Sequence, residues 1–94
     1  MNAFQKTDIH PTWQGTIHLC SPIKDMQKAS RVLRALTTVP PSDIQRMIFE
    51  AHQLGEASLL HCHREKGEWL MLQASKFDVR LAWRARTEQL IGKG

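Results

Sequence analysis

The alternation of side chains from Phe77 to Ala85 constrains the fold of this chain more than any other stretch. The apolar positions are Phe77, Val79, Leu81, Trp83 and Ala85, and the positions between them are Asp78, Arg80, Ala82 and Arg84. Successive side chains of a β-strand point to opposite faces of the sheet, so a period of two is typical of a half-buried strand. The sequence therefore predicts a strand over 77–85.

A β-hairpin is predicted immediately before this strand. Leu59–Arg64 and Glu68–Ala74 are short, largely apolar runs, and the three residues between them end in Gly67. A three-residue connection with a glycine suits a bulged hairpin turn, because glycine readily takes the left-handed conformation that such a turn needs. Together with the strand that follows, these runs predict a three-stranded antiparallel meander.

The pairing register of this meander assigns its side chains to two faces. Extending the hairpin pairing outward from Arg64 and Glu68 fixes which residues share a face. The predicted core face holds Leu60, Cys62, Leu70, Leu72, Phe77, Val79, Leu81 and Trp83. The predicted open face carries His61, His63, Trp69, Met71, Arg80, Ala82 and Arg84. A three-residue second turn would instead bury Trp69 and Met71, because a slip of one residue turns a whole strand over.

The first half of the chain predicts one strand and two helices. Thr12–Cys20 alternates in the manner of a half-buried strand. Ser21 and Pro22 form a helix-start signal, and the apolar stripe that follows predicts a helix to about Leu36.

The second helix begins in a capping box and stops at a glycine. Ser42 is followed three residues later by Gln45, and apolar residues then recur at helical spacing up to Gly55. Residues 1–11 lack periodicity and predict a flexible lead-in, whereas residues 87–94 predict a short helical turn or a frayed end.

The predicted fold class is therefore α+β. The order is strand, helix, helix, strand, strand, strand, with a four-stranded, mainly antiparallel sheet and two helices on one of its faces. Ninety-four residues suit one small domain over 1–94. No apolar run is long enough for a membrane span and no secretion signal is evident, so we expect a cytoplasmic protein with no membrane partner.

The candidates for metal or covalent chemistry are weak. His18, Cys20, His61 and His63 supply ligand types that zinc prefers, but their spacing does not match a zinc motif. Cys62 lies between two histidines, yet adjacent strand residues point to opposite faces, so neither histidine can readily activate its sulfur. We therefore predict no enzyme activity, no metal and no cofactor, with both cysteines as reduced thiols.

The predicted open face is the best candidate for binding. Trp69 and Met71 make it more apolar than solvent requires, and the formal net charge of the chain is +4. The candidate binding residues are Trp69, Met71, His61, His63, Lys76, Arg80 and Arg84, with Lys24, Lys28 and Arg31 on the first helix. Bases of a nucleic acid could stack on the indole while the cations meet phosphates.

Two functions follow from this face. The first is a small non-catalytic module that binds nucleic acid or a nucleoprotein complex. The second is a protein-binding inhibitor or adaptor, of the kind that phages and plasmids carry, which occupies an acidic or nucleic-acid site on its partner. The face could also be covered by a second copy of the chain in a homodimer. The cations of the first helix could equally form an ordinary solvated surface.

Overall fold

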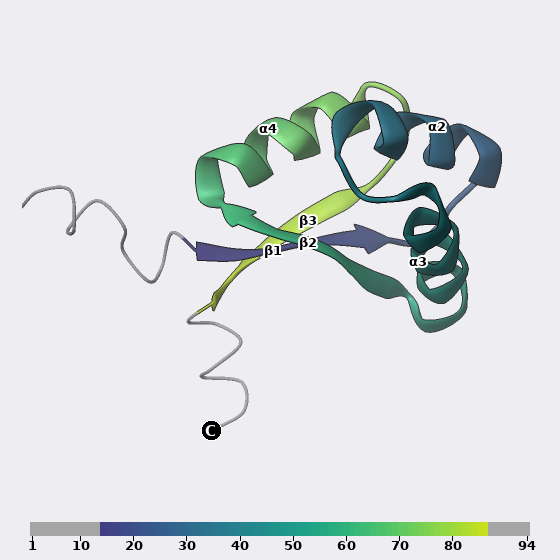
Figure 1. The fold of residues 1–94 in the computed structure, drawn as a ribbon, viewed down its shortest axis with the longest axis horizontal. Helices are drawn as coiled ribbons and strands as arrows, with labels where there is room; N and C mark the ends of the chain where they lie inside the picture. Colours follow the sequence, from purple (N-terminus) through teal and green to yellow (C-terminus); the bar gives the residue numbers. More distant parts are fainter. Residues whose placement is uncertain (1–13, 87–94) are drawn as a thin grey trace, which may run out of the picture.

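The computed structural model describes residues 14–86 of the chain. They form, in order, β1 (Gln14–Cys20), α2 (Met26–Leu36), α3 (Pro41–Leu54), β2 (Glu56–His63), α4 (Arg64–Ser75) and β3 (Leu81–Ala85) (Figure 1). The predicted lead-in over 1–11 and the predicted tail over 87–94 lie outside the described residues. No helix within 14–86 combines the length and the apolar character needed to cross a bilayer.

The first strand of the chain lies in the centre of the sheet. The strand order is β2-β1-β3, and both pairings are antiparallel. Gln14 pairs with His63 at one end, while at the other end Leu19 lies between Ala57 of β2 and Leu81 of β3. The register between β1 and β2 shifts once, after Ile17.

The predicted sheet of four strands with two helices is wrong, because the third predicted strand is helix α4. Within the described residues the sheet has three strands, and the element order is strand, helix, helix, strand, helix, strand. The buried residues of α4 are Gly67, Leu70 and Ala74, at the three- and four-residue spacing of one helix face. The predicted hairpin treats Gly67 as a turn residue. The helical spacing of Gly67, Leu70 and Ala74 is therefore not recognised from the sequence.

Gly67 is required by packing, since the indole of Trp83 lies directly against it. A Cβ atom at Gly67 would stand 2.4 Å from Cδ1 of Trp83, and one at Gly15 of β1 would stand 2.6 Å from the other ring of the same indole. The indole Nε1 donates a hydrogen bond of 3.1 Å to the carbonyl oxygen of Cys62. Two glycines therefore make room for one tryptophan between the sheet and α4.

The last strand is shorter than predicted. It begins at Leu81, and its inward face is as expected: Leu81 is buried, and Trp83 packs against the core. Phe77 and Leu72, both predicted in the core, are about half exposed. Both errors follow from α4, because Leu72 lies on its outer side and Phe77 falls in the turn after it.

The two predicted helices of the first half are confirmed, with different starts. Helix α2 begins at Met26 rather than near Ser21, because Asp25 is the residue that caps it and accepts a hydrogen bond of 3.0 Å from the amide of Lys28. Helix α3 begins at Pro41 without a side-chain cap and ends at Gly55, whose φ of 99° is in the left-handed region.

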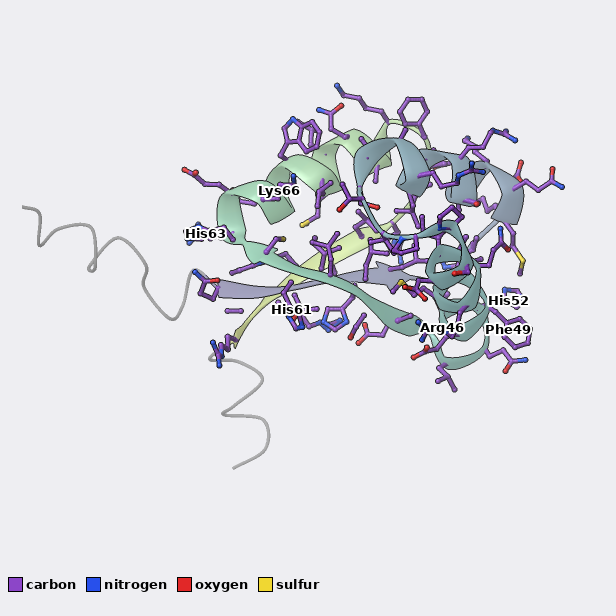
Figure 2. The ribbon with its side chains drawn as sticks, in the orientation of Figure 1. Arg46, Phe49, His52, His61, His63 and Lys66 are labelled. Carbon is purple, nitrogen blue, oxygen red and sulfur yellow. The ribbon has the colours of Figure 1, made fainter. Side chains whose placement is uncertain are left out.

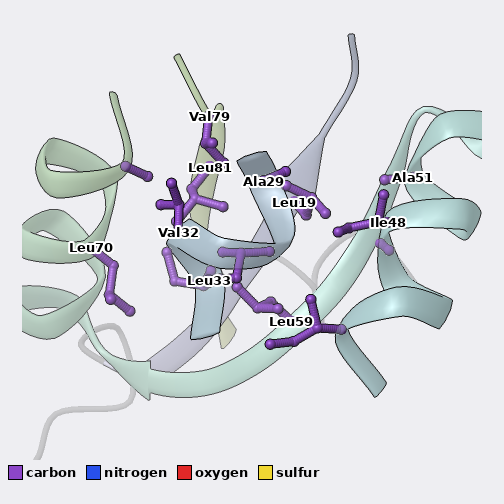
Figure 3. Close-up of a cluster of buried hydrophobic side chains, with 14 residues drawn as sticks. Leu19, Ala29, Val32, Leu33, Ile48, Ala51, Leu59, Leu70, Val79 and Leu81 are labelled. Carbon is purple, nitrogen blue, oxygen red and sulfur yellow. The ribbon is translucent and has the colours of Figure 1, made fainter. Parts of the chain in front are cut away.

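The hydrophobic core lies between the sheet and the three helices (Figure 3). Its largest fully buried side chains are Ile17, Leu19, Leu33, Ile44, Ile48 and Leu70. These six residues come from β1 and from each of the helices, so every helix is fixed to the sheet by at least one leucine or isoleucine.

Candidate functional site

The predicted binding face is not formed, because its residues lie on different elements. Trp69 and Met71 belong to helix α4, and Lys76 is the residue that ends that helix. Arg80 precedes β3, and Arg84 lies on it. The indole is therefore not placed beside the two arginines on a sheet surface, although it is exposed as expected.

Of the three candidate cations of the first predicted helix, two lie on α2 and one precedes it. Lys24 precedes α2 and lies 3.9 Å from the carboxylate of Asp78, while Lys28 and Arg31 lie within the helix. Lys24 thus faces an acidic neighbour across the surface. Exposed ion pairs of this length contribute little to stability.

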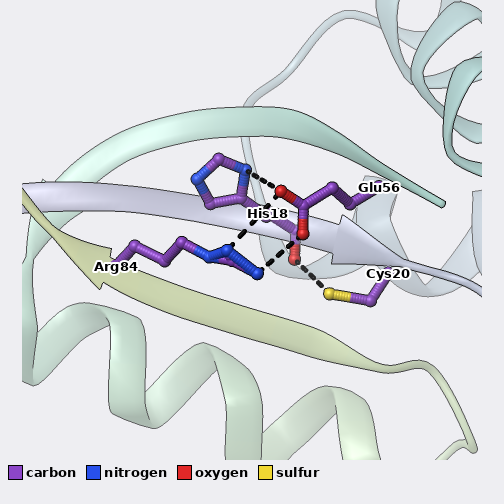
Figure 4. Close-up of polar contacts among 4 residues, drawn as sticks. All are labelled: His18, Cys20, Glu56 and Arg84. Atoms are coloured by element: carbon purple, nitrogen blue, oxygen red, sulfur yellow. Dashed lines mark hydrogen bonds and ion pairs between the residues drawn. The ribbon is translucent and has the colours of Figure 1, made fainter. Parts of the chain in front are cut away.

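The outer face of the sheet carries an ion pair that spans the central strand. Arg84 of β3 donates hydrogen bonds of 2.7 and 3.5 Å to the two carboxylate oxygens of Glu56 on β2 (Figure 4). Between them, Nδ1 of His18 on β1 lies 3.9 Å from Glu56. The arginine that we predicted to meet phosphates is therefore paired with a carboxylate of its own chain.

His18 is buried beneath this ion pair. Its Nε2 has no hydrogen-bond partner among the described residues. Burial lowers the pKa of His18 below its ordinary value of 6.5, and Arg84 and His61 act in the same direction, while Glu56 opposes them. The imidazole of His18 is therefore neutral at neutral pH. Nearby, Nδ1 of His61 lies 3.0 Å from the hydroxyl oxygen of Thr16.

Neither cysteine has an environment that activates a thiol. Burial raises the pKa of Cys20 and of Cys62, so the nucleophilic thiolate is disfavoured in both. The Sγ of Cys20 is directed to the carbonyl oxygen of His18 at 3.8 Å. Within 14–86, no group of three or more histidine, cysteine or acidic residues is arranged to hold a metal ion.

A groove runs beside the last residues of β2, and we call it the β2 groove. Its walls are the connector between α2 and α3 on one side and the end of β2 with the start of α4 on the other. The lining residues are Leu36, Thr37, Thr38, Val39, Pro40, Leu60, His61, Cys62, His63 and Lys66. In Figure 2, His63 and Lys66 lie above the strands at the start of α4, whereas His61 lies below the strands. Every titratable nitrogen in this lining is basic, and no carboxylate belongs to it.

Sequence reasoning found two histidines of this groove but missed its other wall. The connector was interpreted only as a break between helices, because its prolines exclude regular structure. One residue of the connector could have indicated this wall. Val39 is apolar and lies between two threonines and two prolines, and in the structure it packs against the core. Lys66 was assigned to a hairpin turn and so was not considered.

Several large apolar side chains are exposed outside the groove. Trp69, Leu72 and Phe77 lie on or just after α4, with 48%, 58% and 48% of their surface exposed. On the outer side of α3, Phe49 is exposed between Arg46 and His52 (Figure 2). Apolar surface of this kind often marks a site of protein contact.

The comparisons with known proteins identify the fold. No protein-family model and no curated protein sequence matches the chain. A solved structure that does match is that of Agrobacterium tumefaciens ClpS2 bound to L-phenylalaninamide. The two align with a TM-score of 0.72 and 18% sequence identity, over 82% of this chain and 100% of that one. The chain therefore has the same fold as ClpS2. None of these comparisons supports binding to nucleic acid.

Proposed function

We propose that this protein is a non-catalytic, cytosolic adaptor that binds an acidic, extended segment of a partner protein in the β2 groove. This is the protein-binding function that the sequence left as the alternative. The observation that best supports this proposal is the lining of the groove. Apolar side chains, Lys66 and two histidines lie there beside the edge of strand β2. The nucleic-acid function loses its basis, because the face on which it depended is divided between a helix and a strand.

The strand edge supports an extended ligand. Among the described residues, β2 pairs with β1 on one side and with no strand on the other. The backbone groups of an edge strand can pair with an added peptide strand, and side-chain pockets along the edge then select the sequence. Leu60 and Cys62 are only partly buried and offer apolar contact beside that edge.

The charge of the groove supports an acidic ligand. Lys66 is a cation in the lining and no carboxylate belongs to it, so an acidic ligand meets an opposite charge and no like charge. The overall charge of +4 acts in the same direction at longer range.

The ligand of ClpS2 supports a peptide-like class of partner without specifying the site. L-phenylalaninamide keeps a free ammonium group and replaces the carboxylate with an amide, as in the first residue of a peptide. The 18% sequence identity between the two chains supports a shared fold and not a shared ligand, so we do not extend that ligand to this chain.

The test is a titration of the isotope-labelled protein, followed by NMR. The probes are an extended acidic hexapeptide, a basic hexapeptide of the same length, L-phenylalaninamide and a single-stranded DNA oligonucleotide. We expect the acidic peptide to shift the backbone amides of 60–63 and 37–39, and Lys66→Glu to weaken this binding about tenfold. Lys24→Glu is the matched control, because it makes the same charge change away from the groove.

Two outcomes would contradict the proposal. Acidic peptide that leaves the amides of 60–63 unshifted at millimolar concentration would exclude the groove. Binding of the oligonucleotide alone, with a steep dependence on salt, would restore the nucleic-acid function.

A further inference from the structure

Four exposed side chains form one stripe along the outer face of α4. They are Glu65, Trp69, Leu72 and Lys76, and they are separated by four, three and four residues. This is the spacing of the contact positions in a two-stranded coiled coil. Lys76 ends the helix with φ of −64° and ψ of −19°, so the stripe keeps helical geometry to its last residue.

We propose that this stripe is a dimerisation surface, on which a second copy of the chain packs its own α4 in the antiparallel direction. The sequence analysis considered a second copy on the sheet, whereas the structure places the self-complementary surface on this helix. The inference does not rest on the proposed function, and its test leaves Lys66 of the β2 groove unchanged.

The order of charges along the stripe carries the inference. The stripe reads acidic, apolar, apolar, basic from its first residue to its last. If a twofold axis crosses the helix between Leu70 and Met71, Trp69 of each copy meets Leu72 of the other. The same axis brings Glu65 of each copy to Lys76 of the other. Such a twofold contact is isologous, so it forms the Trp69–Leu72 contact twice and the Glu65–Lys76 ion pair twice without a second type of surface.

Three charged side chains beside the stripe already have a contact within the chain. Arg64 and Glu68 are paired with each other at 3.1 Å, and Lys66 lies over the Trp69 ring at 5.9 Å. Glu65 and Lys76 have no ion-pair partner among the described residues. The two charges at the ends of the stripe are therefore the ones that a partner can satisfy.

The dimer should be weak. The stripe is roughly 16 Å long and a helix is about 10 Å wide, so the contact is far smaller than the roughly 800 Å² per partner of a standard interface. We expect a dissociation constant on the order of 100 μM, which corresponds to a few apolar contacts and two ion pairs.

Charge exchange tests both the surface and its direction. Sedimentation equilibrium of the full chain, up to about 1 mM, measures the dimer fraction of Glu65→Lys, Lys76→Glu and the double variant. We expect each single variant to dimerise at least about tenfold more weakly, because both ion pairs become repulsive. The double variant should regain the wild-type affinity. An equimolar mixture of the two single variants should also regain it, since both pairs are then of opposite sign.

Matched controls exclude a general effect of charge. Glu50→Lys on α3 and Arg31→Glu on α2 make the same charge changes on exposed or half-exposed surface and should leave the equilibrium unchanged. Circular dichroism of every variant reports that the fold is kept. A chain that stays monomeric at about 1 mM would overturn the proposal. A dimer that forms equally well in both single variants would overturn it too, because its interface would lie elsewhere.

Discussion

The packing of Trp83 against Gly67 predicts that alanine, a better helix former than glycine, destabilises helix α4 at this position. Helix propensity alone favours Gly67→Ala by about 0.8–1 kcal/mol. The new Cβ would stand 2.4 Å from Cδ1 and 2.7 Å from Cγ of Trp83. Carbon atoms in contact prefer about 3.5–4.0 Å, so the indole or the helix has to move.

The two effects can be weighed against each other. Overpacking of a well-packed core costs typically about 1–3 kcal/mol, and an overlap of more than 1 Å with the root of a large ring places this site near the upper end. Subtracting the gain in helix propensity, we expect Gly67→Ala to lower the free energy of unfolding by about 1–2 kcal/mol. Moving the ring would also strain its hydrogen bond to Cys62.

A double-mutant cycle separates the clash from every other effect of the substitution. In a Trp83→Leu background the contacts with the ring are lost while the 3.1 Å contact with Cβ of residue 83 stays, so Gly67→Ala should change the free energy of unfolding by less than about 1 kcal/mol. Urea unfolding followed by circular dichroism measures all four proteins. Leu72→Ala, on the exposed side of α4, is the control and should have the same effect in both backgrounds.

The reasoning is refuted if Gly67→Ala stabilises the chain that keeps Trp83. It is equally refuted if the substitution has the same effect in both backgrounds, because the clash with the indole is then not its cause.

Three further predictions concern single residues. Asp25→Ala removes the acceptor of the Lys28 amide and should lower the free energy of unfolding by about 1 kcal/mol in urea, whereas Asp25→Ser should largely keep it. Gly55→Ala should cost about 1 kcal/mol by backbone strain alone, since φ is 99° and no atom lies within 4 Å of the new Cβ; a neutral result would contradict the strain. The pKa of His18 is lowered in the folded protein, so the unfolded chain binds a proton first as the pH falls, and stability should decrease below about pH 6.5. His18→Asn should remove that part of the pH dependence, and parallel profiles of the two proteins in thermal unfolding would argue against it.

The sequence predicted those elements whose periodicity is carried by large side chains. Helix α3 shows isoleucines at helical spacing before a glycine, and β1 shows clean alternation, so both were found. The inward face of β3 was found for the same reason, because Leu81 and Trp83 alternate with polar or small residues.

Helix α4 was missed because two of its three buried residues, Gly67 and Ala74, are small. Gly67 and Ala74 contribute little hydrophobic signal, and they are small because Trp83 and the sheet lie close. Leu72 and Trp69, which dominate the local pattern, are on the exposed side. A short apolar run with a glycine before it fits a hairpin equally well, and only the position of the distant Trp83 decides between them.

The candidate site was predicted only in part, because one of its residues lies on helix α4, which the sequence analysis assigned to a hairpin. His61 and His63 were singled out and do line the β2 groove, but Lys66 was lost with the misassigned helix. The partner of Arg84 was also beyond local reasoning, because Glu56 approaches it across a strand that lies between them. Whether the predicted residues bind a partner stays a prediction.

The position of β1 has a consequence for how the protein is made. Of the strands within 14–86, β1 is synthesised first and occupies the middle of the sheet, yet one of its two neighbours, β3, is synthesised last. Until Leu81–Ala85 leaves the exit tunnel, the nascent chain carries a central strand with one bare edge. Premature termination anywhere before that segment would yield a product that exposes this edge to aggregation rather than a smaller working domain.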